Sequence, residues 1–277
     1  MKNAMHSSHI NATPKDLAGN NGIGRYILLP GSDGRAKEIA NHFDKLQVKT
    51  HERGIHLYLG TLDAEGESID VAAIASGMGC PSMEIYLHEL FNLGAKRFLR
   101  LGTAGSLQPW VKTGDLINVQ ASVRDENTSE RYLPLEFPAV ASLEVTSSIL
   151  LAAEQLNIFD KLHTGVVHCK SSLYAREFGA GPLKDENQQY RDLLHQAGVL
   201  ASEMETATLF IQSQIYNHQL QLKNEASSSR VLAGALLGVV SSAEVGFDAA
   251  QAPAVVQEII ELGLEAVKIL ALQELAG

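Results

Sequence analysis

One segment near the middle of the chain constrains the fold more than any other. An apolar run of buried-strand character at 69–75 ends in a glycine-containing turn at 76–79, and a helical pattern follows over 81–94. A second strand-like run begins at position 97. Proline lies in the first turn of this helix and glycine at its end, where each is favoured. A strand, a helix and a strand at this spacing predict a parallel βαβ unit.

Similar segments alternate along the rest of the chain. Further strands are predicted at 26–29, within 45–62, and at 114–119, 164–169 and 231–240, and further helices at 35–43, 143–156, 190–198, 201–216 and 254–275. Two long loops, 124–140 and 170–185, lie between them, and long loops in compact domains usually carry function. The alternation predicts a single α/β domain over 21–277, with a mixed, largely parallel central sheet flanked by helices, after a mobile segment at 1–20.

Composition argues against several classes of function. The formal net charge is −10, which disfavours a general role on nucleic acid or on a membrane surface, since both partners are polyanions. The two cysteines, Cys80 and Cys169, are too few for a disulfide framework and lack metal-ligand spacing. No apolar run approaches the ~18 residues of a membrane span, and the N-terminus lacks the apolar core of a signal peptide. We therefore expect a cytoplasmic protein without a bound metal.

Two of the predicted strand ends combine arginine with glycine. These residues are Gly31, Gly34 and Arg35 after the first strand, and Arg100, Gly102, Thr103 and Gly105 around the strand that begins at position 97. We expect Gly102 and Gly105 to turn the backbone, so that its N–H groups and the guanidinium bind one anion. Neither segment has the lysine of a P-loop or the dinucleotide fingerprint, so free phosphate is favoured over a nucleotide. An ordinary strand and turn with a solvated arginine is the alternative.

Three motifs in a fixed order carry a family resemblance. They are Pro30-Gly-Ser-Asp-Gly-Arg35, Phe98-Leu-Arg-Leu-Gly-Thr-Ala-Gly105 and Ser202-Glu-Met-Glu-Thr-Ala207. Together they resemble the nucleoside phosphorylases, the superfamily of purine nucleoside and uridine phosphorylases, and most closely the uridine phosphorylases. The similarity extends over nearly the whole chain, from His9 to the last helix. It implies the three-layer α/β/α fold of that family and an enzyme, a pentosyltransferase.

The resemblance implies a role for each matching residue. Phosphate would be bound by Gly31, Arg35, Arg100 and Thr103, and by Arg53 from a neighbouring subunit. The nucleoside would be bound by Thr103, Gly105, Lys170, Tyr174, Glu203, Met204 and Glu205, and by His9 from the adjacent subunit. Arg100, Thr103 and Glu205 would be the catalytic residues, with Glu205 accepting hydrogen bonds from the 2′ and 3′ hydroxyls of the ribose.

The resemblance also implies the reaction and its partners. A pyrimidine nucleoside, uridine first, and inorganic phosphate would give free base and ribose 1-phosphate, with phosphate as co-substrate and no cofactor. Each site would be built from two chains, so the minimal unit would be a homodimer, which in this family is often arranged in a hexamer. Some family dimers hold potassium through a glutamate. Gly54 stands at that position, so we expect no monovalent cation there.

The base pocket is where the chain departs from the family pattern. The loop at 170–178 lacks the glutamine and arginine with which one branch reads uracil, and Ser171 and Leu173 differ from the Lys-Asp-Ser-Phe-Tyr run of another branch. Ser241 and Ser242 replace the catalytic aspartate of purine-cleaving relatives, which argues against efficient purine cleavage. Two alternatives stay open: a purine nucleoside phosphorylase or nucleosidase, and a non-catalytic nucleoside-binding protein on the same fold.

Several of these residues also have a purely structural interpretation. Glu203 and Glu205 fit carboxylates in the first turn of a helix, where they interact with the helix dipole. Met204 fits a core residue. His9 fits a disordered histidine in a terminal segment, and Arg53 fits an exposed ion-pair residue.

Overall fold

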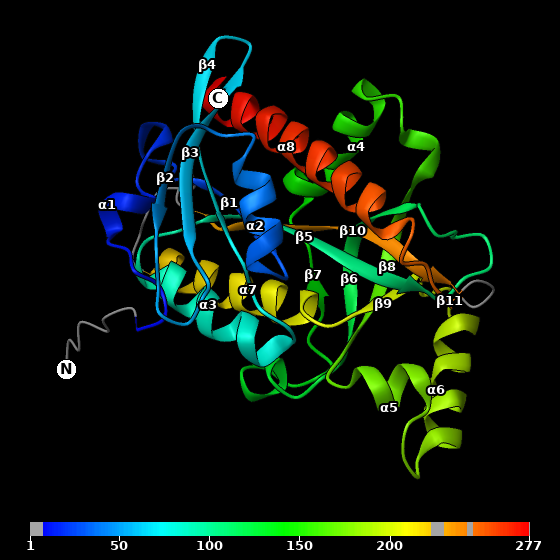
Figure 1. The fold of residues 1–277 in the computed structure, drawn as a ribbon. Coiled ribbons are helices and arrows are strands. Elements are labelled where there is room, and N and C mark those ends of the chain that lie inside the picture. Colours follow the sequence, from blue (N-terminus) through cyan, green and yellow to red (C-terminus); the bar gives the residue numbers. More distant parts are fainter. Residues whose placement is uncertain (1–7, 223–229, 243–245, 277) are drawn as a thin grey trace.

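The computed structural model describes residues 8–222, 230–242 and 246–276. Its strands are β1 Tyr26–Pro30, β2 Asp44–Lys49, β3 Leu57–Ala64, β4 Glu67–Ile74, β5 Arg97–Ser106, β6 Leu116–Asp125, β7 Ala139–Val140, β8 Leu162–Lys170, β9 Ala201–Glu203, β10 Leu232–Ser242 and β11 Gly246–Phe247. Its α-helices are α1 Pro14–Leu17, α2 Asp33–Ala40, α3 Cys80–Asn92, α4 Leu143–Gln155, α5 Leu173–Phe178, α6 Lys184–Gln196, α7 Thr206–Leu222 and α8 Ala252–Ala276 (Figure 1). Short 3-10 turns occur at Asn20–Gly22, Ser129–Arg131 and Phe159–Lys161.

The strands form one mixed sheet in which β5 is central. β1 pairs in parallel with both β4 and β5, so the predicted parallel βαβ unit is confirmed, with β1 lying between its two strands. β10 pairs in parallel with β5 and antiparallel with β6, while β8 connects β6 to β9 and β9 returns to β5. The strands β5, β10, β6, β8 and β9 therefore close on themselves, and β1, β4, β3 and β2 extend the sheet from β5.

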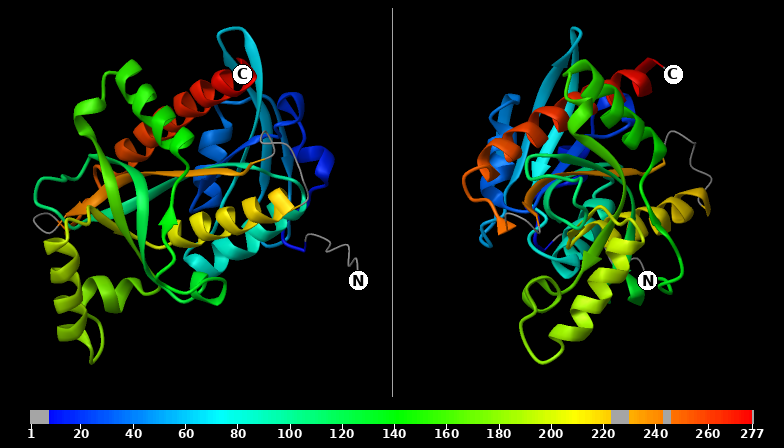
Figure 2. Two further views of the ribbon diagram at one scale, coloured as in Figure 1. Left: turned by 180° about the vertical axis from the view of Figure 1, so that it is seen from behind. Right: turned by 90° about the vertical axis from the view of Figure 1, so that its right-hand side faces the viewer.

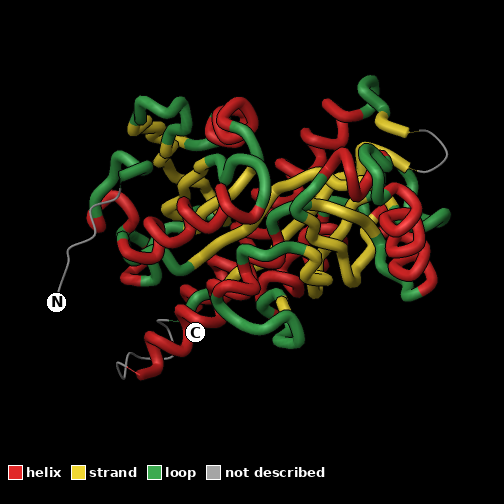
Figure 3. The backbone as a smooth tube through the Cα atoms, turned by 90° about the horizontal axis from the view of Figure 1, so that it is seen from below, coloured by secondary structure: helices red, strands yellow, loops and turns green. Residues whose placement is uncertain are grey.

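Helices cover both faces of the sheet, which confirms the predicted α/β class. Because neighbouring strand residues point to opposite faces, Leu28 packs in the cluster that includes α2, α4 and α8, whereas Leu29 packs in the cluster that includes α3 and α7. Figure 2 shows α3 and α7 side by side on one face and α8 on the other. Seen from below, the strands cross the middle of the molecule between helices (Figure 3).

The expected turn at Gly102 and Gly105 is wrong, because β5 continues to Ser106. Its backbone stays paired with β10 as far as Gly105 and then with Ser202 of β9. Neither glycine has a positive φ. A Cβ at Gly102 would lie 2.7 Å from a terminal nitrogen of Arg100. These glycines therefore provide space beside the strand rather than a change of direction.

Two further segments differ from expectation. The predicted helix at 201–216 begins only at Thr206, because 201–203 form β9 between β5 and β8. The predicted loop at 170–185 contains α5, which begins where the Ser172 hydroxyl accepts a hydrogen bond from the Ala175 N–H. Most of the polar connection expected at 217–230 lies in α7 or outside the described residues.

The N-terminal residues that the structure describes are tied to the body. The Glu89 carboxylate of α3 accepts backbone hydrogen bonds from Ser8, His9 and Ile10. Ile10 and Leu17 are buried in the core. Among the described residues, no helix has both the length and the apolar character needed to cross a membrane.

Candidate active site

A cavity of about 630 Å³ opens where β1, β5 and β8 end. It brings together ten of the twelve predicted site residues: Gly31, Arg35, Arg100, Thr103, Gly105, Lys170, Tyr174, Glu203, Met204 and Glu205. Eight of these residues come from the three motifs, which are about seventy and one hundred positions apart in the sequence, and Lys170 and Tyr174 come from the 170–178 segment. Other residues, to which the sequence analysis assigned no role, also line the cavity, Ser202 and Glu177 among them.

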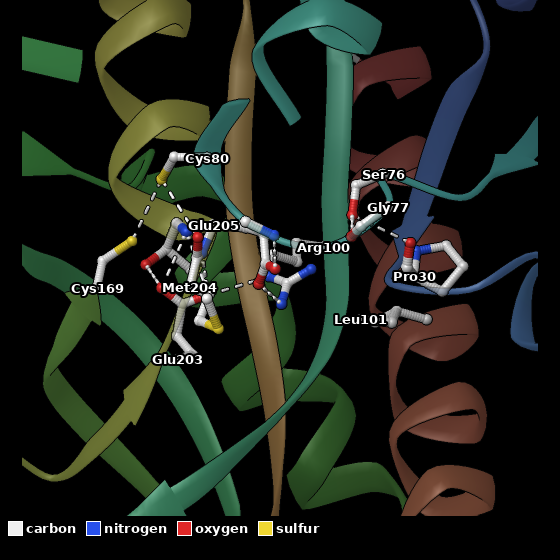
Figure 4. Close-up of polar contacts among 12 residues, drawn as sticks. Pro30, Ser76, Gly77, Cys80, Arg100, Leu101, Cys169, Glu203, Met204 and Glu205 are labelled. Carbon is white, nitrogen blue, oxygen red and sulfur yellow. Dashed lines mark hydrogen bonds and ion pairs between the residues drawn. The ribbon is translucent and has the colours of Figure 1, made fainter. Parts of the chain in front are cut away.

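Arg100 is buried at the centre of this cavity between two carboxylates. Its side chain on β5 forms one ion pair with Glu205 and a second, 3.3 Å from Nε to Oε2, with Glu203 (Figure 4). Its Nη1 atom is buried and has no hydrogen-bond partner among the described residues. A buried N–H donor without a partner is costly, so this atom is available for a further acceptor in the cavity.

Glu203 interacts mainly with other groups of the protein. Its carboxylate accepts hydrogen bonds from the backbone N–H groups of Glu205 and Thr206, at 2.9 and 3.0 Å, and from the Thr206 hydroxyl. It thereby satisfies donors at the start of α7, the function expected of an acidic residue at a helix N-terminus. Burial opposes its charge, but the Arg100 cation and these donors lower the pKa of Glu203, so it is a carboxylate.

The pKa of Glu205 is shifted in the opposite direction from that of Glu203. Burial and the neighbouring Glu203 charge raise its pKa above the ordinary value, although Arg100 opposes this. One of its oxygens accepts a hydrogen bond from the Gly79 N–H, 2.6 Å away at the start of α3. A carboxylate oxygen has two lone pairs, so Glu205 still has acceptor capacity for the hydroxyls of a ligand.

A second guanidinium lies close to Arg100. Arg35 of α2 is half-buried, and its Nη1 donates to the Leu101 carbonyl at 3.4 Å. Burial, and then the positive charge of Arg100, lower the pKa of Arg35. Two cations that repel each other beside Gly31 and the Thr103 hydroxyl form a site whose electrostatics favour a bound anion.

The opposite end of the cavity carries a different charge arrangement. Lys170, at the end of β8, forms an ion pair of 3.0 Å with Glu177 of α5. Arg191 of α6 lies 3.8 Å from the same carboxylate and also donates to the Glu177 backbone carbonyl. Sequence reasoning missed Glu177, because its place in the cavity depends on how α5 packs. Tyr174 of α5 lies at the exposed mouth, with 71% of its surface accessible.

A chain of polar groups lies behind Lys170. The Lys170 Nζ is 2.7 Å from the Ser202 hydroxyl, which is 2.9 Å from His168 Nδ1. His168 Nε2 is 2.9 Å from Asp125, whose carboxylate also binds Arg176 in a bidentate pair. Burial raises the pKa of Asp125, but the hydrogen bonds from His168 and Arg176 outweigh it and lower that pKa.

Cys80 and Cys169 lie next to the motif at 202–207. Their sulfur atoms are 3.6 Å apart, and the Cys80 thiol donates to the Met204 carbonyl at 3.2 Å (Figure 4). Burial raises the pKa of the Cys169 thiol, so it stays protonated and unreactive. Both cysteines act here as small buried side chains.

His9 and Arg53 do not line the cavity. His9 Nδ1 is 2.7 Å from Glu89, and its ring meets Tyr86 edge to face. The positive charge of Arg53 also acts on Tyr86 and lowers its pKa, although burial outweighs this and raises it. Both were expected to reach a neighbouring subunit, and that assignment stays a prediction.

A second cavity of about 410 Å³ lies between the 106–112 segment and α6. It shares Arg191 with the ion-pair cluster at the end of β8. None of the predicted site residues lines it.

Comparison with known proteins shows the family of the chain. The family model of the phosphorylase superfamily matches residues 25–259. The chain belongs to this superfamily.

Among curated relatives, the uridine phosphorylase of Treponema pallidum is 37% identical over 190 residues, which cover 68% of this chain and 71% of that protein. The uridine phosphorylase of Thermococcus kodakarensis is 36% identical over 211 residues, covering 75% and 72%. The guanosine phosphorylase of Halorubrum lacusprofundi is 31% identical over 183 residues, covering 66% and 69%.

Proposed function

We propose that this phosphorylase cleaves uridine with inorganic phosphate to give uracil and ribose 1-phosphate. The observation that carries the proposal is Arg100, fixed between Glu203 and Glu205 with Nη1 unpaired in the described structure and with Arg35 beside it. A phosphate dianion bound there relieves the repulsion between the two guanidinium groups. The uridine phosphorylases among the relatives support uridine as the nucleoside.

Each of these residues has a task in the reaction. Arg35, Arg100, Thr103 and the Gly31 backbone hold phosphate next to the sugar, and this positioning replaces an encounter from solution. Glu205 accepts hydrogen bonds from the ribose hydroxyls, and its negative charge favours the electron-poor sugar ring that forms as the C1′–N1 bond breaks. Met204 packs against the ribose in this arrangement. Phosphate is the co-substrate, and the reaction needs no cofactor.

Uracil fits the far end of the cavity. Lys170 and Glu177 place an N–H donor and a carboxylate acceptor 3.0 Å apart. Uracil offers a carbonyl oxygen beside an N–H group on one edge, which is the complementary pattern. Cytosine has an unprotonated nitrogen where uracil has that N–H, so the Glu177 carboxylate disfavours it.

A guanosine phosphorylase activity is the second candidate. A 6-oxopurine offers the same carbonyl and N–H edge to Lys170 and Glu177, and the Halorubrum lacusprofundi relative bears that name. Ser241 and Ser242 stand where purine-cleaving relatives have their acid, which ranks this activity below uridine phosphorolysis.

The proposed assembly is a homodimer or a hexamer of such dimers, with His9 and Arg53 reaching the partner's cavity. Both residues act on Tyr86, His9 through a ring contact and Arg53 through its charge, which supports their lying on one side of the molecule. The free thiols of Cys80 and Cys169 fit the reducing cytoplasm as the proposed compartment.

Base release from a panel of nucleosides tests the proposal. Uridine, deoxyuridine, thymidine, inosine, guanosine and methylthioadenosine are each incubated with and without phosphate. We expect phosphate-dependent release that is fastest for uridine. Preference for guanosine or inosine supports the second candidate, and tight nucleoside binding without turnover in any condition supports a binding protein instead.

A further inference from the structure

The second cavity is separated from the candidate active site by the ends of two strands. Gly105 of β5 and its partner Ser241 of β10 line the first cavity. The next residues along each strand, Ser106 and Ser242, line the second. Successive residues of a strand point to opposite sides, and none of the described residues lines both cavities. The second cavity is therefore a site of its own, and its volume of about 410 Å³ is in the range of small-molecule sites.

Hydrogen bonds hold the two walls of this cavity together. One wall is the segment after β5, and the other is α6. Gln108 Nε2 donates to the carbonyls of His195 and Val199, at 3.0 and 2.8 Å, and so satisfies acceptors at the C-terminal end of α6. His195 Nδ1 lies 2.8 Å from the Leu107 carbonyl, which can only accept, so Nδ1 carries the proton. The cavity is therefore formed without a ligand.

The amide of Gln108 leaves one acceptor without a partner. Because Nε2 lies against two carbonyl oxygens, the orientation of the amide is fixed, and Oε1 is its remaining polar atom. Gln108 is 3% exposed, and Oε1 is buried with no hydrogen-bond partner among the described residues. A buried acceptor in this state is costly. An N–H donor on a ligand in the cavity would remove that cost.

The α6 wall supplies a donor without a partner. Arg191 lines the cavity, while its two terminal nitrogens are directed to Glu177. Nη1 donates to the Glu177 backbone carbonyl, and Nη2 lies 3.8 Å from the carboxylate. These contacts hold the guanidinium in place. The Nε–H is buried and has no acceptor in the part of the chain that the structure describes, so a ligand oxygen can fill that role.

These two atoms indicate the chemistry of a ligand. An anion would accept from Arg191 Nε but would put negative charge beside the oxygen of Gln108. A hydrocarbon would satisfy neither atom. A planar ring with an N–H next to a carbonyl oxygen supplies the donor and the acceptor together. Leu107, Pro109 and Val111 add apolar lining that such a ring can contact. Uracil is a ring of this kind.

We propose that the cavity between the 106–112 segment and α6 binds a second molecule of uracil. Its ring N–H donates to Gln108 Oε1, and its neighbouring carbonyl accepts from Arg191 Nε. The base is bound and released unchanged, and each chain holds two uracil molecules, one in each cavity. The site goes beyond the proposed function, and only the choice of uracil as its occupant rests on that function, in which uracil is the product.

Counting bound uracil tests the inference. Equilibrium dialysis with radiolabelled uracil should give two molecules per wild-type chain at saturation. Gln188 is an exposed residue of α6 that lines the cavity, so Gln188→Trp should fill it and leave one molecule bound, with kcat for uridine unchanged. Gln189→Trp is the matched control, because the neighbouring Gln189 is exposed and does not line the cavity. It should leave two molecules bound.

A second ligand tests the role of the N–H group. In 1,3-dimethyluracil both ring nitrogens carry methyl groups, so it has no donor for Gln108 and should not displace the second uracil. Displacement would overturn the assignment of a ring N–H to this site. Circular dichroism checks the fold of each variant. Pro109→Trp, at an exposed residue of the opposite wall, decides the question if Gln188→Trp does not fold.

One uracil per wild-type chain would overturn the inference, and so would two in a folded variant with the cavity filled. Loss of turnover together with one uracil in Gln188→Trp would also overturn it, because the lost molecule would then belong to the active cavity. In each case wild-type cleavage of uridine would leave the proposed function standing. A wild-type protein that binds the second uracil but releases no base from uridine in phosphate would refute the proposed function and keep the site.

Discussion

The two ends of the cavity are built in different ways. At the end proposed to bind phosphate and ribose, Arg100 and Glu205 come from a central strand and from the turn before α7, and both are almost fully buried. At the end proposed to bind the base, Glu177 belongs to the short helix α5, which projects with α6 beyond the sheet (Figure 1). Phe178 and Tyr174 of the same helix are exposed.

This difference separates what the reaction requires from what selects the base. The buried end is over-determined around Arg100, which pairs with both Glu203 and Glu205, while each of these carboxylates also accepts backbone hydrogen bonds. The α5 end depends on the Asp125–Arg176 and Lys170–Glu177 pairs between helix and sheet. Changes at the first end should therefore abolish turnover, and changes at the second should alter which base is accepted.

Loss of the central cation should have the largest effect. Arg100→Ala is expected to weaken phosphate use by about 2 to 5 kcal/mol, the range for removing one partner of a buried charge pair. Steady-state kinetics with varied phosphate measures this. Arg131→Ala, at an exposed arginine, is the control and should leave the phosphate dependence unchanged. Wild-type phosphate dependence in Arg100→Ala would show that the anion site lies elsewhere.

Removing the Glu205 charge should have the next largest effect. Glu205→Gln loses a charged acceptor for ribose hydroxyls, so kcat/KM for uridine should fall by about 2 kcal/mol. The loss should be smaller for 2′-deoxyuridine, which has one hydroxyl fewer. Equal losses for both substrates would place Glu205 away from the 2′ hydroxyl.

The same residue predicts a pH dependence. Burial and Glu203 raise the pKa of Glu205, so its carboxylate form is lost at a higher pH than that of a free glutamate. If the carboxylate is required, wild-type kcat/KM falls as the pH is lowered through that raised pKa. A pH profile of Glu205→Gln should lack this acid limb. An unchanged limb in the variant would assign it to another group.

Filling the space beside β5 should lower stability. A Cβ at Gly102 would meet Arg100 and Leu237, each at 2.7 Å, so Gly102→Ala should cost about 1 to 3 kcal/mol of unfolding free energy in urea denaturation. Gly34→Ala is the matched control, because no atom lies within 4 Å of its Cβ and its φ is not positive. It should be neutral or slightly stabilising. Equal stability of the two variants would contradict the packing argument.

The smallest effect is expected at the base end. Glu177→Gln replaces an obligate acceptor by an amide that also donates, so discrimination between uridine and cytidine should fall by about 1 kcal/mol. Inhibition constants for the two nucleosides measure it. The rate of uridine cleavage should fall less in Glu177→Gln than in Glu205→Gln. Unchanged discrimination would mean that Glu177 does not face the base.

The motifs predicted which residues meet around Arg100, and the phosphate and ribose roles of these residues stay predictions. The family, the α/β fold class and the enzyme class are confirmed by the comparisons. The sequence identified Arg100 and Glu205 because both stand at fixed positions of the family motifs. The turn at Gly102 was wrong because glycine there makes room for Arg100, which depends on a neighbouring side chain rather than on the local backbone.

The base end could not be predicted in the same way. His168 and Ser202 meet because β8 and β9 are neighbours, and Asp125 joins them from β6. No local pattern in the sequence says which strands are adjacent. Glu177 lines the cavity from α5, where the preceding residue, Arg176, binds Asp125 of β6.

The most direct test of the central claim is the fate of the sugar. Phosphorus NMR of the wild-type protein with uridine and phosphate should show ribose 1-phosphate formed in step with uracil, and no base release when phosphate is omitted. Release of free ribose at a rate independent of phosphate would contradict a phosphate site at Arg35 and Arg100.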